Sequence, residues 1–392
     1  MLRSVYRLLP PLGWPILAGA LVLSAVGLAA IYAGESDAES VPAKTLRQAV
    51  FLGVGIVGLV VVQIVGYQRT LTWAYPLYAV TLVLLALLVI GRYVPMDPII
   101  PRRRSTYRWI VLGPLNIQVS DLAKIVYVLT LAAYLRFRTS YRRFTGLLTP
   151  FVLTLIPVAL ILKEPDLGTS LLFPPTLMIL LFAAGAKIKH LLVVLLLGAA
   201  AIPAFYFSPL MNDYQRQRFQ VLFRQNDNDT RWQMGPGYQL NQSKIALGSG
   251  QFMGRGLREG AFFRYRLLPE EHNDFIFAVI GHQTGFVGCT AVLLCMIVIV
   301  VSGLTIASVS TDPFGRLVAV GVCALVFVQT VINIGMTIGL TPITGMSLPF
   351  VSSGGSGLVT NYLSIGLLIS VGRRRTLDSA PRPFEFDEES EA

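Results

Sequence analysis

The chain has 392 residues, of which 54% are hydrophobic and only 14% carry a full charge, whereas roughly 25% of residues are charged in an ordinary soluble domain. This composition excludes a soluble globule, an intrinsically disordered chain and a collagen-like chain. The net charge of +11 does not indicate nucleic-acid binding, because most lysines and arginines lie in short segments between apolar runs, where they meet anionic lipid headgroups.

Long apolar runs follow one another along the chain, most of them near the roughly 20 residues that a membrane-spanning helix needs. Eight runs are separated by charged or polar residues: Leu12–Tyr32, Gln48–Gly66, Thr72–Gly91, Leu122–Phe137, Phe144–Leu162, Leu167–Ala186, Leu191–Ser208 and Phe275–Val301. The uncharged stretch Leu317–Gly372 is too long for one span, and the turn-forming residues Gly339–Gly345 divide it into two helices joined by a short polar loop. The sequence therefore predicts an all-α polytopic membrane protein with ten transmembrane helices.

The basic residues orient this predicted bundle. An even number of spans places both termini on one side of the membrane, and cytoplasmic loops carry the excess of lysine and arginine. With cytoplasmic termini, the inner segments hold fourteen basic residues and the short outer loops hold eight. We therefore expect a multi-pass protein of the cytoplasmic (inner) membrane with both termini in the cytoplasm. The basic run Arg102–Arg104 lies on the wrong side for this rule, and its role is open.

One connection is far longer than the others. Residues 209–273 join spans 7 and 8, and loops of this length in a compact domain usually have a function. In the predicted topology this long loop is extracytoplasmic. Residues 1–375 then form a single transmembrane domain, and the acidic residues 376–392 form a disordered cytoplasmic tail to which we assign no role.

Ionisable residues at the ends of spans are costly in a membrane and are therefore candidates for function. The first group precedes or enters the fourth span: Arg108, Gln118, Asp121 and Lys124. Asp121 and Lys124 are three residues apart on a helix, so their side chains can pair. Two interpretations are open. Either Ser120 is an N-cap and the pair is structural, or Lys124 faces a phosphate group.

A second group of ionisable residues lies at the outer end of spans five and six. Glu164 and Asp166 stand in this turn. The structural interpretation is a capped turn, in which Asp166 accepts hydrogen bonds from the amides that open the sixth helix. The functional interpretation is a binding site.

The third group of ionisable residues lies where the long loop re-enters the membrane, and comprises Glu270, Glu271, His272 and Asp274. Asp274 immediately precedes the apolar run of the eighth span. Partial removal from water makes a carboxylate a stronger base, so Asp274 is a candidate general base. The alternative is an N-cap for the eighth span. Earlier in the loop, Arg216 and Arg218 add fixed positive charge.

Five segments, in the right order along the chain, resemble the SEDS family of polytopic membrane proteins, which includes the RodA and FtsW peptidoglycan glycosyltransferases. They are Arg108–Ile110 with Gln118–Lys124, Glu164–Ser170, Gly237–Gln239 with Gln242–Ala246, Leu268–Glu270 with Asp274–Ala278, and Asn333–Met336 with Pro342, Gly345, Leu348–Phe350 and Gly354–Ser356. Within the third region, Lys244–Gly250 is more similar to the RodA branch than to the FtsW branch.

The resemblance implies a transferase that polymerises lipid II into glycan strands outside the cytoplasmic membrane, with a class B penicillin-binding transpeptidase as partner. Asp274 matches the family's base, and undecaprenyl diphosphate is the leaving group. Lys124 and Arg108 match positions that can hold this diphosphate. A divalent cation, Mg²⁺ or Mn²⁺, is an expected cofactor with no ligands assigned. Further substrate-binding candidates are Gln118, Asp121, Glu164, Asp166, Arg216, Arg218, Gln242, Ser243, Lys244, Glu270 and His272.

Three departures from the family pattern limit this transfer. Asp121 stands where the family usually has glutamate, Asn273 stands where it has threonine, and His282-Gln283 replaces two glutamates. The last change leaves open whether activity is reduced or lost. Two other functions therefore stay open: a flippase or transporter of lipid-linked precursors, which would suit the interrupted run near Pro342, and a non-catalytic scaffold of a cell-wall complex. The sequence does not decide between elongation and division.

Overall fold

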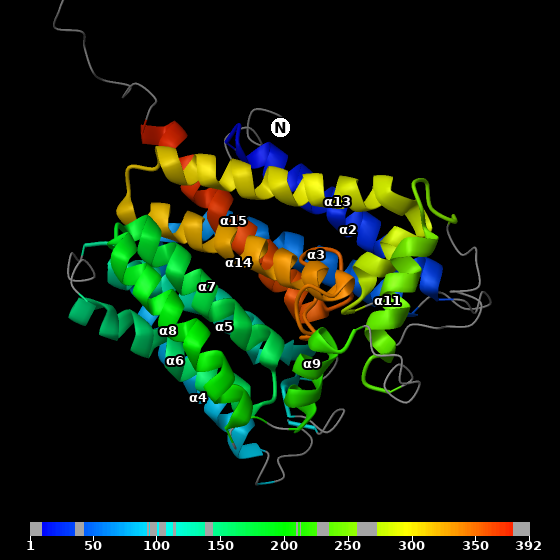
Figure 1. Cartoon of the computed structure of the whole chain (residues 1–392). Coiled ribbons are helices and arrows are strands. Elements are labelled where there is room, and N and C mark those ends of the chain that lie inside the picture. Colours follow the sequence, from blue (N-terminus) through cyan, green and yellow to red (C-terminus); the bar gives the residue numbers. More distant parts are fainter. Residues whose placement is uncertain are drawn as a thin grey trace, which may run out of the picture.

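The computed structural model describes residues 10–35, 43–91, 94, 100–101, 107–112, 115–137, 144–208, 211, 213–225, 235–256 and 273–378. Within these ranges the protein is a bundle of helices (Figure 1). The helices are α2 (Gly13–Gly34), α3 (Ala43–Val65), α4 (Tyr67–Gly91), α5 (Val119–Leu135), η2 (Phe144–Leu147), α6 (Leu148–Lys163), α7 (Leu167–Ala184), α8 (Ile188–Phe207), α9 (Asp213–Phe223), α11 (Tyr238–Ser249), α13 (Ile276–Val309), α14 (Pro313–Ile338) and α15 (Gly355–Asp378). The predicted all-α polytopic fold is confirmed.

The number of spans is a separate question. Eight helices of the described chain are long and apolar enough to cross a membrane. The fourth and seventh predicted spans correspond to α5, which has 17 residues, and to α8, whose apolar part Ile188–Ala201 is shorter than a crossing needs. The count of ten therefore stays a prediction. In the order of the chain, however, a helix stands at each of the ten predicted positions.

Helix α14 lies at the centre of the bundle. It packs against α13, α7, α5 and α15, while α15 packs along α3. Close approach is possible at Gly321, where a Cβ atom would lie only 2.4 Å from the Val128 side chain of α5. Small residues allow this approach in membrane bundles, where lipid is as apolar as leucine and packing holds the helices together.

The outward faces of the bundle are apolar. Large hydrophobic side chains are exposed along α3, α8 and α13, among them Ile64 at 72%, Leu196 at 69% and Val301 at 56%. On a soluble protein a surface of this kind would drive association. Around a set of helices long enough to span a bilayer, it is the surface that lipid covers.

A short β-hairpin precedes α5 and was not predicted. Strand β1 (Trp109–Leu112) pairs antiparallel with β2 (Leu115–Gln118), and Trp109 lies opposite Gln118. The segment is too short for a clear alternating pattern, so its sequence gives a weak signal. The hairpin brings Arg108 next to the residue that opens α5.

The connection between α14 and α15 is longer than the predicted turn Gly339–Gly345. Helix α14 ends at Gly339 in the left-handed region, and α15 begins only at Gly355. We call residues 340–354 the α14–α15 loop. Pro342 and Pro349 lack the amide proton that a continuing helix would need, and Phe350 has a φ of 64° while its buried ring packs edge-on against Tyr362. In Figure 1 this loop lies near α9 and α11 at one end of the bundle.

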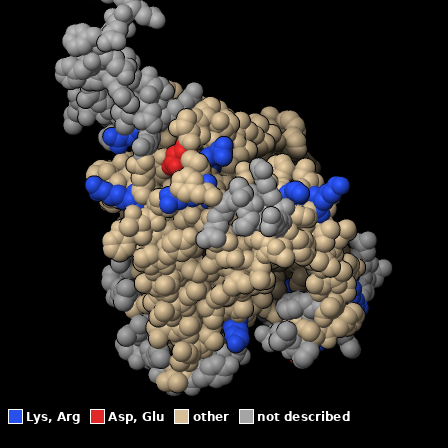
Figure 2. All heavy atoms as spheres, turned by 90° about the vertical axis from the view of Figure 1, so that its left-hand side faces the viewer, with Lys and Arg blue, Asp and Glu red and all other residues tan. Residues whose placement is uncertain are grey.

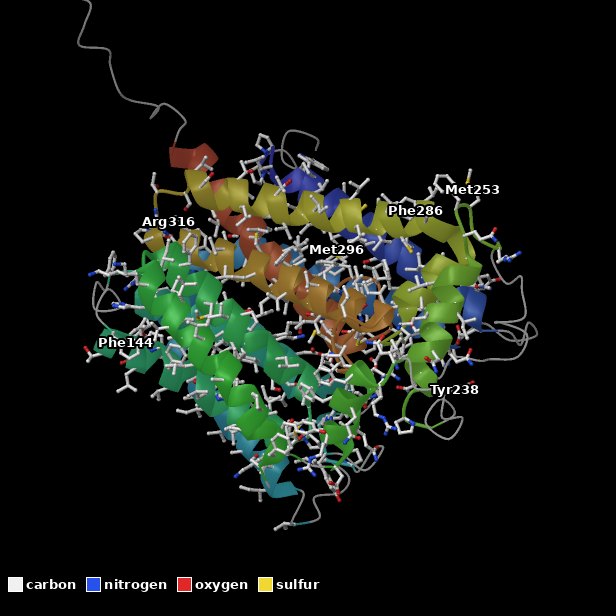
Figure 3. The ribbon with its side chains drawn as sticks, in the orientation of Figure 1. Phe144, Tyr238, Met253, Phe286, Met296 and Arg316 are labelled. Atoms are coloured by element: carbon white, nitrogen blue, oxygen red, sulfur yellow. The ribbon has the colours of Figure 1, made fainter. Side chains whose placement is uncertain are left out.

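Helix α13 is longer than predicted and is broken. Gly285 has φ 66° and ψ −158°, which interrupts the helix nine residues after its start. The chain that follows α11 fills the break: Arg255 N donates to His282 O at 2.9 Å, and Phe286 N donates to Gln251 O at 2.9 Å. Met253 and Phe286 lie close together at this end of α13 (Figure 3), and Phe286 stacks on Phe252.

Candidate active site

The predicted pair at the start of α5 is formed and buried. Lys124 Nζ lies 2.7 Å from Asp121 Oδ1, and the two residues are 4% and 8% exposed. Ser356, in the first turn of α15, donates a hydrogen bond of 2.9 Å to the other carboxylate oxygen of Asp121. Asp121 therefore connects the cation of α5 to α15. Ser120 is not an N-cap as one interpretation expected, because Gln118 holds that position and makes no side-chain cap.

The second group forms a closed structural turn around Asp166. As predicted by the structural interpretation, Asp166 is the N-cap of α7 and accepts from Thr169 N at 3.2 Å. Its carboxylate also accepts from Thr169 Oγ1, from Gln118 Nε2 and from Ser120 Oγ, at 2.9, 3.1 and 3.2 Å. Asp166 and Gln118 thus join α7 to the start of α5.

Arg108 holds the same turn from outside. It donates to the carbonyl oxygen of Glu164 at 2.8 Å and to that of Pro165, and its Nη1 lies 4.0 Å from Asp166 Oδ1. These contacts use the backbone carbonyls that end α6. Arg108 therefore stabilises the α6–α7 turn.

Glu164 is the unusual member of this turn. Both carboxyl oxygens are buried, and neither has a hydrogen-bond donor among the residues that the structure describes. Burial, followed by the negative charge of Asp166, raises the pKa of Glu164 to about 9, although Arg108 acts in the opposite direction. The side chain is therefore protonated at neutral pH.

Asp274 is held by its backbone at the start of α13. Its carbonyl oxygen accepts from Asn333 Nδ2 at 2.9 Å, and the carbonyl oxygen of Asn273 accepts from Ser352 Oγ at 2.6 Å. Phe275, not Asp274, occupies the N-cap position of α13, and no side-chain cap forms there. The N-cap interpretation of Asp274 is therefore wrong.

The Asp274 carboxylate and the Arg218 guanidinium meet at Gly345. A Cβ atom at Gly345 would lie 3.2 Å from Arg218 Nη1 and 3.3 Å from Asp274 Oδ2, and Gly345 has a φ of 73°. Arg218 also donates to the carbonyl oxygen of Ile343 at 2.9 Å. A glycine is needed here both for the backbone conformation and for the space beside the two charged groups.

The two arginines predicted in the long loop have different surroundings. Arg216 lies 3.4 Å from Asp213 and donates to the carbonyl of Tyr206, whose ring it also faces. These contacts attach α9 to the end of α8. Only Arg218 reaches the neighbourhood of Asp274.

The candidates on α11 hold the end of α14. Ser243 is fully buried and donates to Thr337 O at 2.8 Å. Lys244 donates to the side-chain oxygen of Gln225, whose amide in turn donates to Gly339 O at 2.7 Å. Gln242 is half-buried on the same helix. Ser243 and Lys244 therefore position α11 against α14.

The positions where the family usually has two glutamates are both buried here. His282 Nδ1 lies 2.7 Å from Ser249 Oγ, at the end of α11. Gln283 is 3% exposed, and its Nε2 has no partner within the described ranges. The histidine thus takes part in the packing of α11 on the first part of α13.

The three groups of ionisable candidate residues lie next to one another in the folded protein. Ser120 of the first group bonds to Asp166 of the second. Beyond the turn, a Cβ atom at Gly168 would lie 2.9 Å from Thr344 O, which is next to Gly345 and hence to Asp274. We call the end of the bundle that carries these residues the Asp274 end.

Some predicted residues lie outside the described ranges, namely Glu270, His272 and the basic run at 102–104.

Among the residues that the structure describes, no three His, Cys, Asp or Glu side chains are grouped as metal ligands. The described side chains therefore do not by themselves form a metal-binding site, and the expected Mg²⁺ or Mn²⁺ stays a prediction.

Sequence reasoning missed three residues of this region: Asn333, Ser352 and Ser356. Asn333 and Ser356 occur in segments that carry the family resemblance, but no role was assigned to them. A polar residue in a long uncharged run was the available signal, because such residues are costly in a membrane helix and usually have a partner.

Comparison with known proteins finds relatives that match most of the chain. A family model for FtsW, RodA and SpoVE, described as a cell cycle protein, matches residues 14–377. The chain is 34% identical to a probable peptidoglycan glycosyltransferase FtsW of Trichlorobacter lovleyi, covering 83% of this chain and 82% of the relative. It is also 34% identical to the peptidoglycan glycosyltransferase MrdB of Escherichia coli K12, over 83% of this chain and 85% of the relative.

Solved structures of related proteins have a fold similar to that of this chain. A chain from a structure titled "Structural coordination of polymerization and crosslinking by a peptidoglycan synthase complex" superposes with a TM-score of 0.75 at 28% identity, covering 92% of this chain and 98% of the other. The rod shape determining protein RodA of Thermus thermophilus gives a TM-score of 0.66 at 27% identity, with 92% and 97% covered. FtsW and MrdB relatives are equally similar in identity, so the predicted closeness to the RodA branch stays a prediction.

Proposed function

The chain belongs to the FtsW/RodA/SpoVE family of cell cycle proteins, and on this basis we propose that it is a membrane-bound peptidoglycan glycosyltransferase with Asp274 as its general base. One observation carries the choice of base. Asn333 and Ser352 fix the backbone at Asp274, and its carboxylate lies beside Gly345 and Arg218. A general base must be held in a fixed position within reach of the proton that it accepts.

Lipid II is the substrate we propose. Its sugars are carried on a lipid-linked diphosphate, so the reacting groups lie at the membrane surface. The candidate residues are at the ends of membrane helices and not at their midpoints, which supports a headgroup reaction. The proposed product is a glycan strand.

The chemistry needs one base and positive charge. Asp274 accepts the proton of the C4 hydroxyl of the acceptor sugar while that oxygen forms a bond to the anomeric carbon of the donor. The bond between this carbon and the diphosphate breaks, and undecaprenyl diphosphate leaves with the electron pair. Its charge must be balanced by cations, so a second acid is not required.

Arg218 and Lys124 are the cations we assign to the diphosphate. Arg218 lies beside Asp274 at Gly345 and also donates to the carbonyl oxygen of Ile343. Lys124 is already paired with Asp121. An ammonium has three donors, so the Asp121 contact leaves capacity for a phosphate oxygen. Asp121, fixed by Ser356, then orients Lys124. No step depends on a divalent cation.

We also propose the orientation and the partner. Lysine and arginine side chains are spread over the face of the molecule that Figure 2 shows. Arg69, Lys189 and Arg316 are exposed residues in the first turns of α4, α8 and α14. An excess of basic residues is typical of the cytoplasmic side, which puts the Asp274 end outside. The likeness to a chain of a complex that coordinates polymerisation and crosslinking supports a class B penicillin-binding transpeptidase as partner.

The substitution Asp274→Asn tests this function. It preserves the volume of the side chain and removes its basicity, so we expect polymerisation of purified lipid II to fall by roughly 10²-fold or more. The measurement is the rate of glycan formation by purified protein, with and without a partner transpeptidase. Asp213→Asn is a matched control, because it makes the same chemical change at an exposed carboxylate on α9.

Three outcomes would contradict the proposal. Polymerisation at near the parent rate by Asp274→Asn would remove Asp274 as the base. If the parent protein forms no polymer but moves lipid II across vesicle membranes, the protein is a flippase; if it does neither, it is a scaffold.

A further inference from the structure

Asn333 connects Asp274 to the α14–α15 loop through one amide group. Its Nδ2 donates to Asp274 O at 2.9 Å and to Met346 O at 2.5 Å. The side chain is fully buried in α14, 20 residues after the start of that helix. An asparagine amide has two N–H donors, and both are used to hold two segments that are far apart in the sequence.

The two bonds fix the base relative to the groups around it. Met346 directly follows Gly345, beside which the carboxylate of Asp274 and the guanidinium of Arg218 lie. Arg218 in turn donates to Ile343 O in the same loop. The position of the loop relative to Asp274 therefore decides the geometry among the base, Arg218 and the space left by Gly345.

The cost of keeping Asn333 indicates a role beyond packing. Its Oδ1 is buried without a donor among the described residues. An unsatisfied buried acceptor destabilises the folded state, because the group loses its hydrogen bonds to water without replacement. A leucine of similar shape would avoid this cost in an apolar helix, although it would leave the two carbonyls without their donor.

Gln329 provides an internal comparison. It lies one turn earlier on the same face of α14 and is also buried, and its Nε2 donates to Ser347 O at 2.8 Å. Gln329 thus attaches the α14–α15 loop to α14 as Asn333 does. Among the described residues, however, it has no bond to the segment of Asp274.

We propose that Asn333 is the positioning residue for Asp274. The inference rests on the proposed function, because it requires Asp274 to act as the base. Displacement of a catalytic group by about 1 Å can cost roughly 10²-fold in rate. Loss of the Asn333 amide should therefore lower kcat while the KM for lipid II stays close to that of the parent, since substrate contacts are unchanged.

The experiment compares Asn333→Leu and Asn333→Asp with Gln329→Leu in purified, folded protein. We expect kcat to fall at least about tenfold in both Asn333 variants, with KM within about twofold, and to fall less than about threefold in Gln329→Leu. Each variant is also combined with Asp274→Asn. If Asn333 acts through Asp274, Asn333→Leu causes no further loss in that background.

Four results would overturn the inference. The first two are a kcat of Asn333→Leu within threefold of the parent value, and a loss of kcat in Gln329→Leu equal to that in Asn333→Leu. The other two are a full additional loss of kcat when Asn333→Leu is added to Asp274→Asn, and failure of both Asn333 variants to fold. These are distinct from failure of the proposed function, in which the parent protein itself forms no polymer or Asp274→Asn is as active as the parent.

Discussion

The protonated carboxyl group of Glu164 makes the stability of the protein dependent on pH. Its pKa is raised to about 9 by burial and by Asp166, so in the folded protein it binds a proton that the unfolded chain releases above about pH 4.5. The folded state is therefore most favoured at low pH, and this contribution is lost as the pH rises towards about 9. The site tolerates a neutral side chain better than a charged one.

We predict that Glu164→Gln stabilises the protein increasingly as the pH rises from about 5 to about 9, by on the order of 1–3 kcal/mol. The measurement is the difference in unfolding temperature between variant and parent across this range.

Glu35→Gln is a control for which the effect of pH on stability has the opposite sign. Partial burial raises the pKa of Glu35, but hydrogen bonds from Thr45 and the amides of Lys44 and Thr45 outweigh it and lower the pKa overall. This variant should be less stable than the parent at neutral pH, and the difference should shrink as the pH falls below about 4. A Glu164→Gln effect that is constant with pH would contradict the argument.

Sequence reasoning succeeded for residues whose partners are close in the chain and failed for those whose partners are distant. The Asp121–Lys124 pair and the Asp166 cap are contacts over three residues, and periodicity predicts them. The bond from Ser356 to Asp121 and the bond from Asn333 to Asp274 cross long stretches of chain. A helical pattern contains no information on which distant segment faces a side chain.

At the scale of elements, the break in α13 links the segment of Asp274 to the chain after α11. Gly285 separates a short first part, which begins directly after Asp274, from the long second part. Amides and carbonyls at both sides of the break bond to residues 251–256. The sequence did not indicate this break, because a single glycine in an apolar run is usually tolerated within a helix.

We predict that Gly285→Ala destabilises the protein, because its φ and ψ lie in a region that is essentially limited to glycine, at a cost of about 1–3 kcal/mol. An added Cβ atom would also lie 2.4 Å from Gly254 N and 2.6 Å from Phe252 O. The unfolding temperature and the rate of lipid II polymerisation should both fall. Gly198→Ala is the matched control, since a Cβ atom there meets nothing within 4 Å in the described structure; equal stability of the two variants would contradict the prediction.

At the scale of the whole molecule, composition and apolar runs predicted the fold class and the helix order. They placed most helix ends close to the observed ones, because the bilayer imposes both the length and the apolar character of a span. An exception is α13, which continues past the predicted end at Val301 to Val309. They did not predict the β-hairpin, the long α14–α15 loop or the packing of α14 at the centre. Those features depend on contacts such as that of Gly321 with Val128, which only the folded arrangement brings together.

The orientation of the whole molecule is the remaining prediction, and it decides on which side of the membrane the proposed reaction takes place. We expect the Asp274 end to be extracytoplasmic, because basic residues are in excess at the other end. Asp213 on α9 has a side chain that is 94% exposed at the Asp274 end, and Lys189 is exposed at the start of α8, at the opposite end. In a background in which the native cysteines, Cys289, Cys295 and Cys323, are replaced by alanine, Asp213→Cys should react with a membrane-impermeant thiol reagent in intact cells. Lys189→Cys should react only after the membrane is permeabilised. The reverse pattern would place Asp274 and Lys124 on the cytoplasmic side, where a base for outward-facing polymerisation has no access to its substrate, and would overturn both the topology and the assigned site of the reaction.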